Sequence, residues 1–76
     1  MDQLAALRVF IRTVEAGSLT RAAAELGLPK STASKLLAQL EQHLGAKLLQ
    51  RSTRSLALTS EGSDYYERAG QLVGKL

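Results

Sequence analysis

The stretch SLTRAAAELGLPKSTASKLLAQLEQHL, residues 18–44, decides the fold of this chain. It contains two short segments whose apolar residues recur at helical spacing, and the tripeptide Gly27-Leu28-Pro29 separates them. Gly27 lets the backbone leave the first helix with a positive φ, and Pro29 presets the φ of a new helical start. Leu28 is expected to fill the corner between the two helices. This pattern predicts a helix-turn-helix.

The first helix of the pair is predicted over residues 19–26, with Ser18 as its N-cap. Its apolar side chains share one face, which we expect to be buried: Ala22, Ala23 and Leu26. Thr20 and Arg21 lie in its first turn, where free backbone N–H groups can also receive a phosphate.

The second helix is predicted over residues 30–44, and either Pro29 or Ser31 starts it. Its expected buried face consists of Ala33, Leu36, Leu37, Leu40 and Leu44. The other face of its first two turns carries small polar and basic side chains: Lys30, Ser31, Thr32, Ser34 and Lys35. Because such side chains reach base edges and phosphates, a helix that begins with them can enter the major groove of DNA.

A third helix is predicted before this pair, over residues 2–16, with Asp2 as its N-cap and Gly17 after its end. Its expected buried stripe consists of Leu4, Leu7, Phe10, Ile11 and Val14. Two helices alone cannot bury enough apolar surface, so this helix is expected to lie across their back.

After the helix-turn-helix, apolar residues no longer recur at helical spacing. Two short apolar runs, residues 48–50 and 56–58, flank a polar tip. We interpret them as a two-stranded wing that carries Arg51 and Arg54, whose guanidinium groups would clamp a phosphate or enter a minor groove. The alternative is a loop with solvated arginines, because the turn lacks the Asn-Gly or Asp-Gly that favours a tight hairpin.

A last helix is predicted from its Thr59 cap to residue 76, with Glu61 favourably placed near its N-terminus. Its apolar stripe consists of Tyr65, Ala69, Leu72, Val73 and Leu76. Part of this stripe is expected to pack on the domain, while the final turns extend beyond the small core. Three glycines weaken the helix by ~1 kcal/mol each relative to alanine. Because no helix-ending signal follows, we expect the chain to be a fragment of a longer protein.

Composition and charge are those of a single globular domain, with 45% hydrophobic and 22% charged residues among 76. The net charge is +3, and residues 20–54 hold six basic residues against two acidic ones. This excess favours a polyanionic partner, although a solvated basic face explains it equally well. The chain contains no cysteine, which fits a reducing cytoplasm, and no apolar stretch of the ~20 residues that a membrane span needs.

Catalysis has little basis in this sequence. His43 is the only histidine, and we expect it to lie at the surface without a nucleophile beside it. Paired carboxylates, a glycine-rich phosphate loop and a metal-ligand cluster are missing from the sequence, so we expect no enzyme, no catalytic residue, no metal and no cofactor. Tyr65 and Tyr66 could stack on bases, but their spacing favours one ring in the core and one at the surface.

Three segments together resemble the N-terminal DNA-binding domain of LysR-type transcriptional regulators. They are LRVFIRTVEAGSLTRAAAELGL at 7–28, STASKLLAQLEQHLGAKLL at 31–49 and QRSTRSLALTSEG at 50–62. The resemblance implies a mainly α fold: a winged helix-turn-helix of three helices and a two-stranded wing over residues 1–58. A long linker helix over residues 59–76 would follow and pair with its twin in a dimer through its apolar stripe, which consists of Tyr65, Ala69, Leu72, Val73 and Leu76.

The resemblance also implies a function, which is sequence-specific binding of double-stranded DNA by a bacterial transcription regulator. The recognition helix would contact the major groove through Lys30, Ser31, Thr32, Ser34 and Lys35. The wing would contact the flanking minor groove or backbone through Arg51 and Arg54, and Thr20 and Arg21 would approach the backbone.

As a dimer on an inverted repeat, such a regulator would work in the bacterial cytoplasm, associated with the nucleoid when bound. A small-molecule inducer would bind only to a larger C-terminal domain, absent here, and the full-length protein would form higher oligomers.

Two departures from the family pattern concern specificity. Pro29-Lys30-Ser31 stands where members commonly have Ser-Gln-Pro, so the usual glutamine readout does not transfer and Lys30 would favour guanine. Lys35 replaces a common arginine, and lysine is a point charge rather than a planar fork. The alternative function is a winged-helix module that binds protein without DNA specificity, which would be expected to expose an apolar patch on its recognition face.

Overall fold

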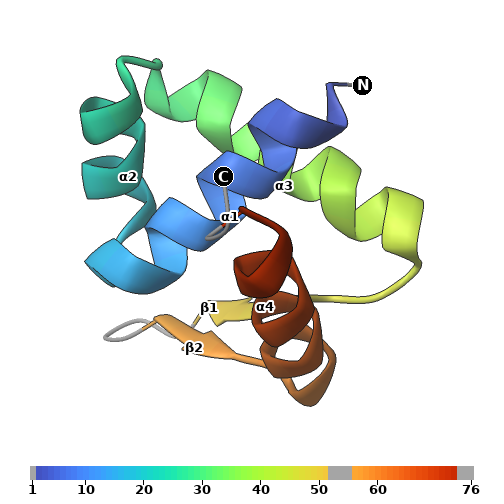
Figure 1. The fold of residues 1–76 in the computed structure, drawn as a ribbon. Coiled ribbons are helices and arrows are strands. Elements are labelled where there is room, and N and C mark those ends of the chain that lie inside the picture. The colour runs from blue at the N-terminus through green and yellow to red at the C-terminus, as the bar shows by residue number, and fades with distance from the viewer. Residues whose placement is uncertain (1, 52–55, 74–76) are drawn as a thin grey trace.

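Three helices form the body of the domain, and a hairpin and a fourth helix pack against it (Figure 1). The structure, a computed structural model, describes residues 2–51 and 56–73. Its elements in chain order are α1 (Gln3–Ala16), α2 (Leu19–Leu26), α3 (Lys30–Leu44), β1 (Leu49–Arg51), β2 (Leu56–Leu58) and α4 (Ser60–Val73). Helix α1 contacts both α2 and α3, while β2 and α4 contact α1 from another side. The described chain is therefore mainly helical, as predicted.

The helix ends follow the predicted capping residues. Asp2 Oδ1 accepts a hydrogen bond of 3.2 Å from the Ala5 N–H, and Ser18 Oγ accepts one of 3.2 Å from the Arg21 N–H. Gly27 ends α2 with a φ of +71°, a left-handed conformation that side chains other than glycine's rarely adopt. Pro29, rather than Ser31, is the N-cap residue of α3, and it makes no side-chain capping hydrogen bond.

The buried face of α1 agrees with the predicted one at Phe10 but otherwise differs, because Leu7, Ile11 and Val14 are only half-buried. It consists of Ala6, Val9, Phe10 and Thr13, whereas Leu4 is 48% exposed. The prediction followed the bulkiest apolar stripe, but helices on two sides cover α1, and small residues allow the closest approach. Thr13 tolerates full burial because its hydroxyl donates a hydrogen bond of 2.6 Å to the Val9 carbonyl.

The helix-turn-helix buries most of the residues expected of it. Ala22, Ala23, Ala33, Leu37 and Leu40 are all buried, as predicted. Two residues, Leu26 and Leu36, are only half-buried, although they still pack against the core. Leu44, which was expected in the core, is the last residue of α3 and is 39% exposed.

Phe10 lies at the centre of the contact between α1 and α4. The Tyr65 ring lies 5.7 Å from it between centroids, and the Tyr66 ring lies 6.2 Å from it in an edge-on arrangement. The prediction that one tyrosine would pack and the other remain at the surface was therefore wrong. Both tyrosines are half-buried, because two consecutive residues of a helix can flank a single large side chain.

The two apolar runs after α3 do form a hairpin, so the loop alternative is wrong. Strands β1 and β2 pair antiparallel, with Leu49 opposite Leu58 and Arg51 opposite Leu56. The tip at residues 52–55 lies outside the described residues. At the other end of the hairpin Leu48 and Leu49 are 1% and 6% exposed, so the base of the wing belongs to the core.

Candidate nucleic-acid interface

The face of α3 opposite the core is polar and basic over its first two turns. Ser31 and Lys35 are exposed and lie four residues apart, on the side away from Ala33 and Leu37. Lys30 and Thr32 are also exposed, whereas Ser34 is half-buried at the edge of this face. The structure thus brings the five residues predicted for the recognition helix onto adjoining positions of one helix end.

The same exposed stripe continues beyond the predicted residues. Ala38 and Gln42 follow Lys35 at helical spacing and are exposed. Gln42 also lines a surface depression of 400 Å³ with Lys47, between the end of α3 and the loop before β1. The sequence-based prediction missed Ala38 and Gln42 because it selected the polar and basic residues of the first two turns. Extending the helical spacing of three to four residues beyond Lys35 would have found both.

Helix α2 packs on α3 and presents the two residues predicted to approach a DNA backbone. The side chains of Thr20 and Arg21 are exposed in its first turn. The backbone N–H of Arg21 is satisfied within the chain by the Ser18 hydroxyl. Its guanidinium group, rather than its N–H, is thus the group that Arg21 offers to a ligand.

The wing arginines and the end of the last helix are described only in part. Arg51 is the last residue of β1, but its side chain is not described, and Arg54 lies outside the described residues. Leu72 and Val73 belong to α4 without described side chains, and Leu76 lies outside. Two residues of the predicted dimer stripe, Tyr65 and Ala69, already pack within the domain: Ala69 is 2% exposed and Tyr65 contacts Phe10.

Helix α4 begins as predicted. The Thr59 side chain caps it by accepting a hydrogen bond of 2.9 Å from the Gly62 N–H. The pKa of Glu61 lies below its ordinary value because a backbone N–H and the Ser60 hydroxyl both donate to its carboxylate. A carboxylate in the first turn also interacts favourably with the positive end of the helix dipole.

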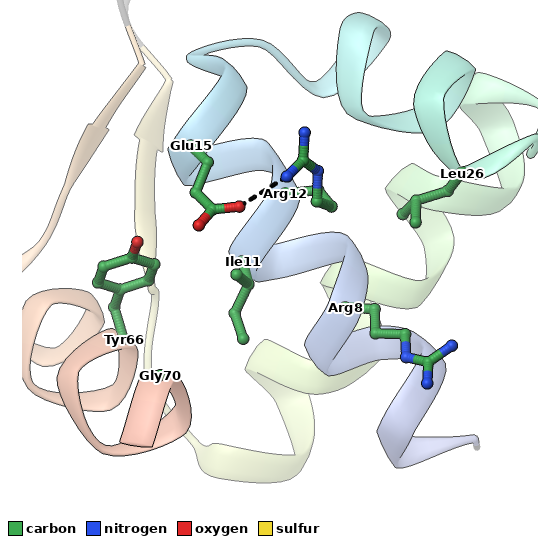
Figure 2. Close-up of a pocket in the computed structure, with 7 residues that line it drawn as sticks. All are labelled: Arg8, Ile11, Arg12, Glu15, Leu26, Tyr66 and Gly70. Carbon is green, nitrogen blue, oxygen red and sulfur yellow. Dashed lines mark hydrogen bonds and ion pairs between the residues drawn. The ribbon is translucent and has the colours of Figure 1, made fainter. Parts of the chain in front are cut away.

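In a second polar region, on α1 and α2, the positive charge of Arg12 is neutralised by neighbouring glutamates. Arg12 pairs with Glu15 at 2.8 Å and with Glu25, which ties α1 to α2. The pKa of Arg12 lies above its ordinary value because Glu25 accepts its hydrogen bond and adds an attractive charge. Figure 2 shows Arg12 and Glu15 beside a groove of 290 Å³ that extends to Leu26 and Tyr66. The lining of this groove includes none of the predicted DNA contacts.

His43 is exposed, and its Nε2 lies 2.9 Å from the Gln3 amide nitrogen. Within residues 2–51 and 56–73, acidic and histidine side chains do not gather into a group of three that would hold a metal ion. None of the described helices is long and apolar enough to span a membrane.

Comparison with known proteins identifies the family of this fold. Residues 4–63 match the family described as "Bacterial regulatory helix-turn-helix protein, lysR family". The chain belongs to the LysR family. The chain is also 47% identical over 76 residues to an HTH-type transcriptional repressor of Pseudomonas aeruginosa. It is 43% identical over 70 residues to the HTH-type transcriptional regulator CrgA of Neisseria meningitidis. The chain spans about a quarter of the length of these relatives, 24% and 23% respectively.

Solved structures of the LysR family share the arrangement of the described helices and hairpin. The crystal structure of the BenM DNA-binding domain in complex with catB site 1 DNA superposes with a TM-score of 0.90 at 35% identity. The match covers 99% of this chain and 83% of that one. OxyR of Corynebacterium glutamicum, as its C206S mutant, superposes with a TM-score of 0.89 at 32% identity, covering 95% of this chain and 22% of that one. The winged helix-turn-helix expected from the sequence is therefore the observed fold. The described part of α4 ends at Val73, so the long linker helix expected over residues 59–76 stays a prediction.

Proposed function

We propose that this LysR-family domain binds double-stranded DNA sequence-specifically, with α3 in the major groove. The observation that carries the proposal is the exposed polar and basic face at the start of α3. The protein-binding alternative would favour an exposed apolar patch on that face, but Lys30, Ser31, Thr32 and Lys35 are the side chains exposed there. The likeness to BenM, whose DNA-binding domain has been crystallised with DNA, supports the same function.

The proposed contacts divide into readout and backbone contacts. Lys30, Ser31, Thr32, Ser34 and Lys35 face base edges and the neighbouring phosphates from α3. Thr20 and Arg21 contact the phosphate backbone from α2, and Arg51 and Arg54 do so from the wing or enter the flanking minor groove. Ser34 is half-buried, so its short side chain reads only a base that approaches α3 closely.

Residues 1–58 form the DNA-binding unit in this proposal, and residues 59–76 begin a linker helix through which two copies pair. Because Tyr65 and Ala69 are engaged within the domain, the pairing surface is assigned to Leu72, Val73 and Leu76. A longer protein would add an inducer-binding domain and higher oligomers, and would act in the bacterial cytoplasm on the nucleoid.

The proposal is tested by selecting duplexes from a random-sequence pool with the chain at fixed salt. A dimer of this kind selects an inverted repeat whose half-sites lie ~10 bp apart, because two recognition helices enter successive major grooves on one side of the duplex. Selection of no common sequence would contradict the proposed function.

Lys30→Ala is expected to relax base preference within the selected half-site. Loss of a good base contact costs ~1–3 kcal/mol on the selected duplex and much less on random DNA. Titration of both duplexes with the wild-type and variant chains measures the difference. Equal weakening on the two duplexes would assign Lys30 to phosphate and not to a base.

Leu72→Glu is expected to prevent pairing through the linker helix, because a charge on an apolar pairing surface must be desolvated. Sedimentation of the wild-type chain should show a larger mass than that of the variant in the presence of the selected duplex. Gln71→Glu, a charge change at an exposed position one residue earlier, is the matched control and should keep the wild-type mass. The same mass for all three chains would refute the assignment of Leu72 to the interface.

A further inference from the structure

Glu41 joins the recognition helix to the base of the wing. It lies on α3, and its Oε2 accepts hydrogen bonds from the backbone N–H groups of Leu48 at 2.7 Å and Leu49 at 3.3 Å. Leu49 is the first residue of β1 and pairs with Leu58 across the hairpin. One half-buried carboxylate oxygen therefore connects α3 directly to the first rung of the wing.

The other strand is held at the same place by Thr59. Its backbone N–H donates a hydrogen bond of 3.1 Å to the Leu48 carbonyl, and its hydroxyl donates to the Lys47 carbonyl. We call Lys47, Leu48, Leu49 and Thr59 the wing root. The buried side chains of Leu48 and Leu49 anchor the wing root in the core. Because the hydrophobic effect is non-directional, this burial alone does not set the orientation of the root. The orientation of the root depends on the directional hydrogen bonds that Glu41 and Thr59 make.

The position of Glu41 is unusual for its charge. Residues 20–54 carry the basic excess of the chain and contain only two acidic residues. A negative charge in this segment opposes binding to a polyanion. Both acids are engaged within the chain: Glu25 pairs with Arg12, and Glu41 accepts two backbone N–H groups. Glu41 thus has a structural reason to stand in an otherwise basic segment.

The same rigid helix carries the proposed reading residues. Glu41 lies six residues after Lys35, which is about 9 Å along an α-helix. We propose that Glu41 is a positioning residue that sets the orientation of the wing relative to the reading end of α3. This inference rests on the proposed function, because it concerns where the wing meets the DNA that α3 reads.

The experiment uses a duplex selected by the wild-type chain and compares variants at position 41. Glu41→Ala removes the acceptor, and Glu41→Asp keeps the charge but withdraws the oxygen by one methylene. Glu41→Gln keeps an acceptor oxygen at the same reach. Glu67→Ala, which removes an exposed carboxylate from α4, is the control for net charge.

Hydroxyl-radical footprints and the salt dependence of binding are the readouts. The Ala and Asp variants are expected to lose protection of the flanking minor groove, and the slope of log K against log salt falls by about 1, because a wing phosphate contact is lost. Base preference in the major-groove half-site stays unchanged. The Gln variant and the Glu67→Ala control keep the wild-type footprint. A merely destabilising change would lower the bound fraction without altering the footprint or the slope.

Three results would overturn the inference. The first is a wild-type footprint for both Glu41→Ala and Glu41→Asp. The second is loss of flanking protection in Glu41→Gln as complete as in Glu41→Ala. If Glu41→Ala fails to fold, the Asp and Gln variants decide between these outcomes. The third is a wild-type chain that selects no duplex, and only this result overturns the proposed function as well.

Discussion

Gly62→Ala is expected to lower the free energy of unfolding by about 3 kcal/mol, the upper part of the range for overpacking a tight contact. Gly62 lies in the first turn of α4, directly against the backbone of Leu48. A Cβ added there would overlap the Leu48 carbonyl oxygen and lie 2.8 Å from its carbonyl carbon. Because the obstacle is backbone and not the end of a flexible side chain, it cannot move aside locally.

The Leu48 backbone is fixed from every side. Its N–H donates to Glu41, its carbonyl accepts from Thr59, and its side chain is 1% exposed in the core. Relief of the clash must therefore move α4 away from the wing root. For a domain of this size the expected loss corresponds to a fall in melting temperature of roughly 12 °C or more.

Gly70→Ala is the matched control on the same helix. A Cβ at Gly70 meets nothing within 4 Å, so alanine should raise the helix propensity there by ~1 kcal/mol without a clash. Thermal unfolding followed by circular dichroism compares the two variants with the wild-type chain. If Gly62→Ala stabilised the domain as Gly70→Ala does, the close approach of α4 to Leu48 would be wrong.

Lys35→Glu is expected to weaken binding of the selected duplex by at least ~100-fold, or about 2.7 kcal/mol. Lys35 is exposed near the centre of the polar face of α3, so reversal of its charge replaces an attraction to DNA with a repulsion at close range. Binding to random duplexes should also fall, because part of this loss is independent of sequence.

Arg8→Glu makes the same change of charge on α1. Arg8 is exposed beside the groove shown in Figure 2, whose lining contains no proposed DNA contact. We expect binding within a few-fold of wild type for this variant at physiological salt, where charges beyond ~8 Å are largely screened. Titration of one labelled duplex with both variants gives the comparison. Equal losses would mean that net charge governs binding and that the α3 face has no special role.

The helices and their caps were predictable because they follow from local patterns, whereas the hairpin, which lacks a tight-turn signal, was favoured by the helix-turn-helix before it. Ser18, Gly27 and Asp2 act through their own backbone neighbourhoods, so a single sequence is enough to assign them. The buried face of α1 was not predictable in the same way. Leu4 and Ala6 lie on nearly opposite sides of one helix, and only the placement of the other helices decides to which side of Phe10 the buried face extends.

In the candidate interface, too, some features follow from the local sequence and others depend on residues far away along the chain. The exposure of Lys30 and Lys35 followed from the period of α3, because polar residues alternate there with a clear apolar stripe. The contacts of Glu41 and Gly62 did not follow, since each depends on Leu48, which lies seven and fourteen residues away along the chain. In the sequence Gly62 reads only as a weak point of α4. In the structure it is the residue that lets α4 reach the wing root.

The cluster of Phe10, Tyr65 and Tyr66 also gives the domain an intrinsic fluorescence probe. The chain contains no tryptophan and only two tyrosines, so all of its ultraviolet emission above 300 nm comes from two adjacent rings of α4. Both rings rest on one phenylalanine of α1. Their emission therefore reports the docking of a single helix, and α4 can be followed during unfolding or DNA binding without attaching a label.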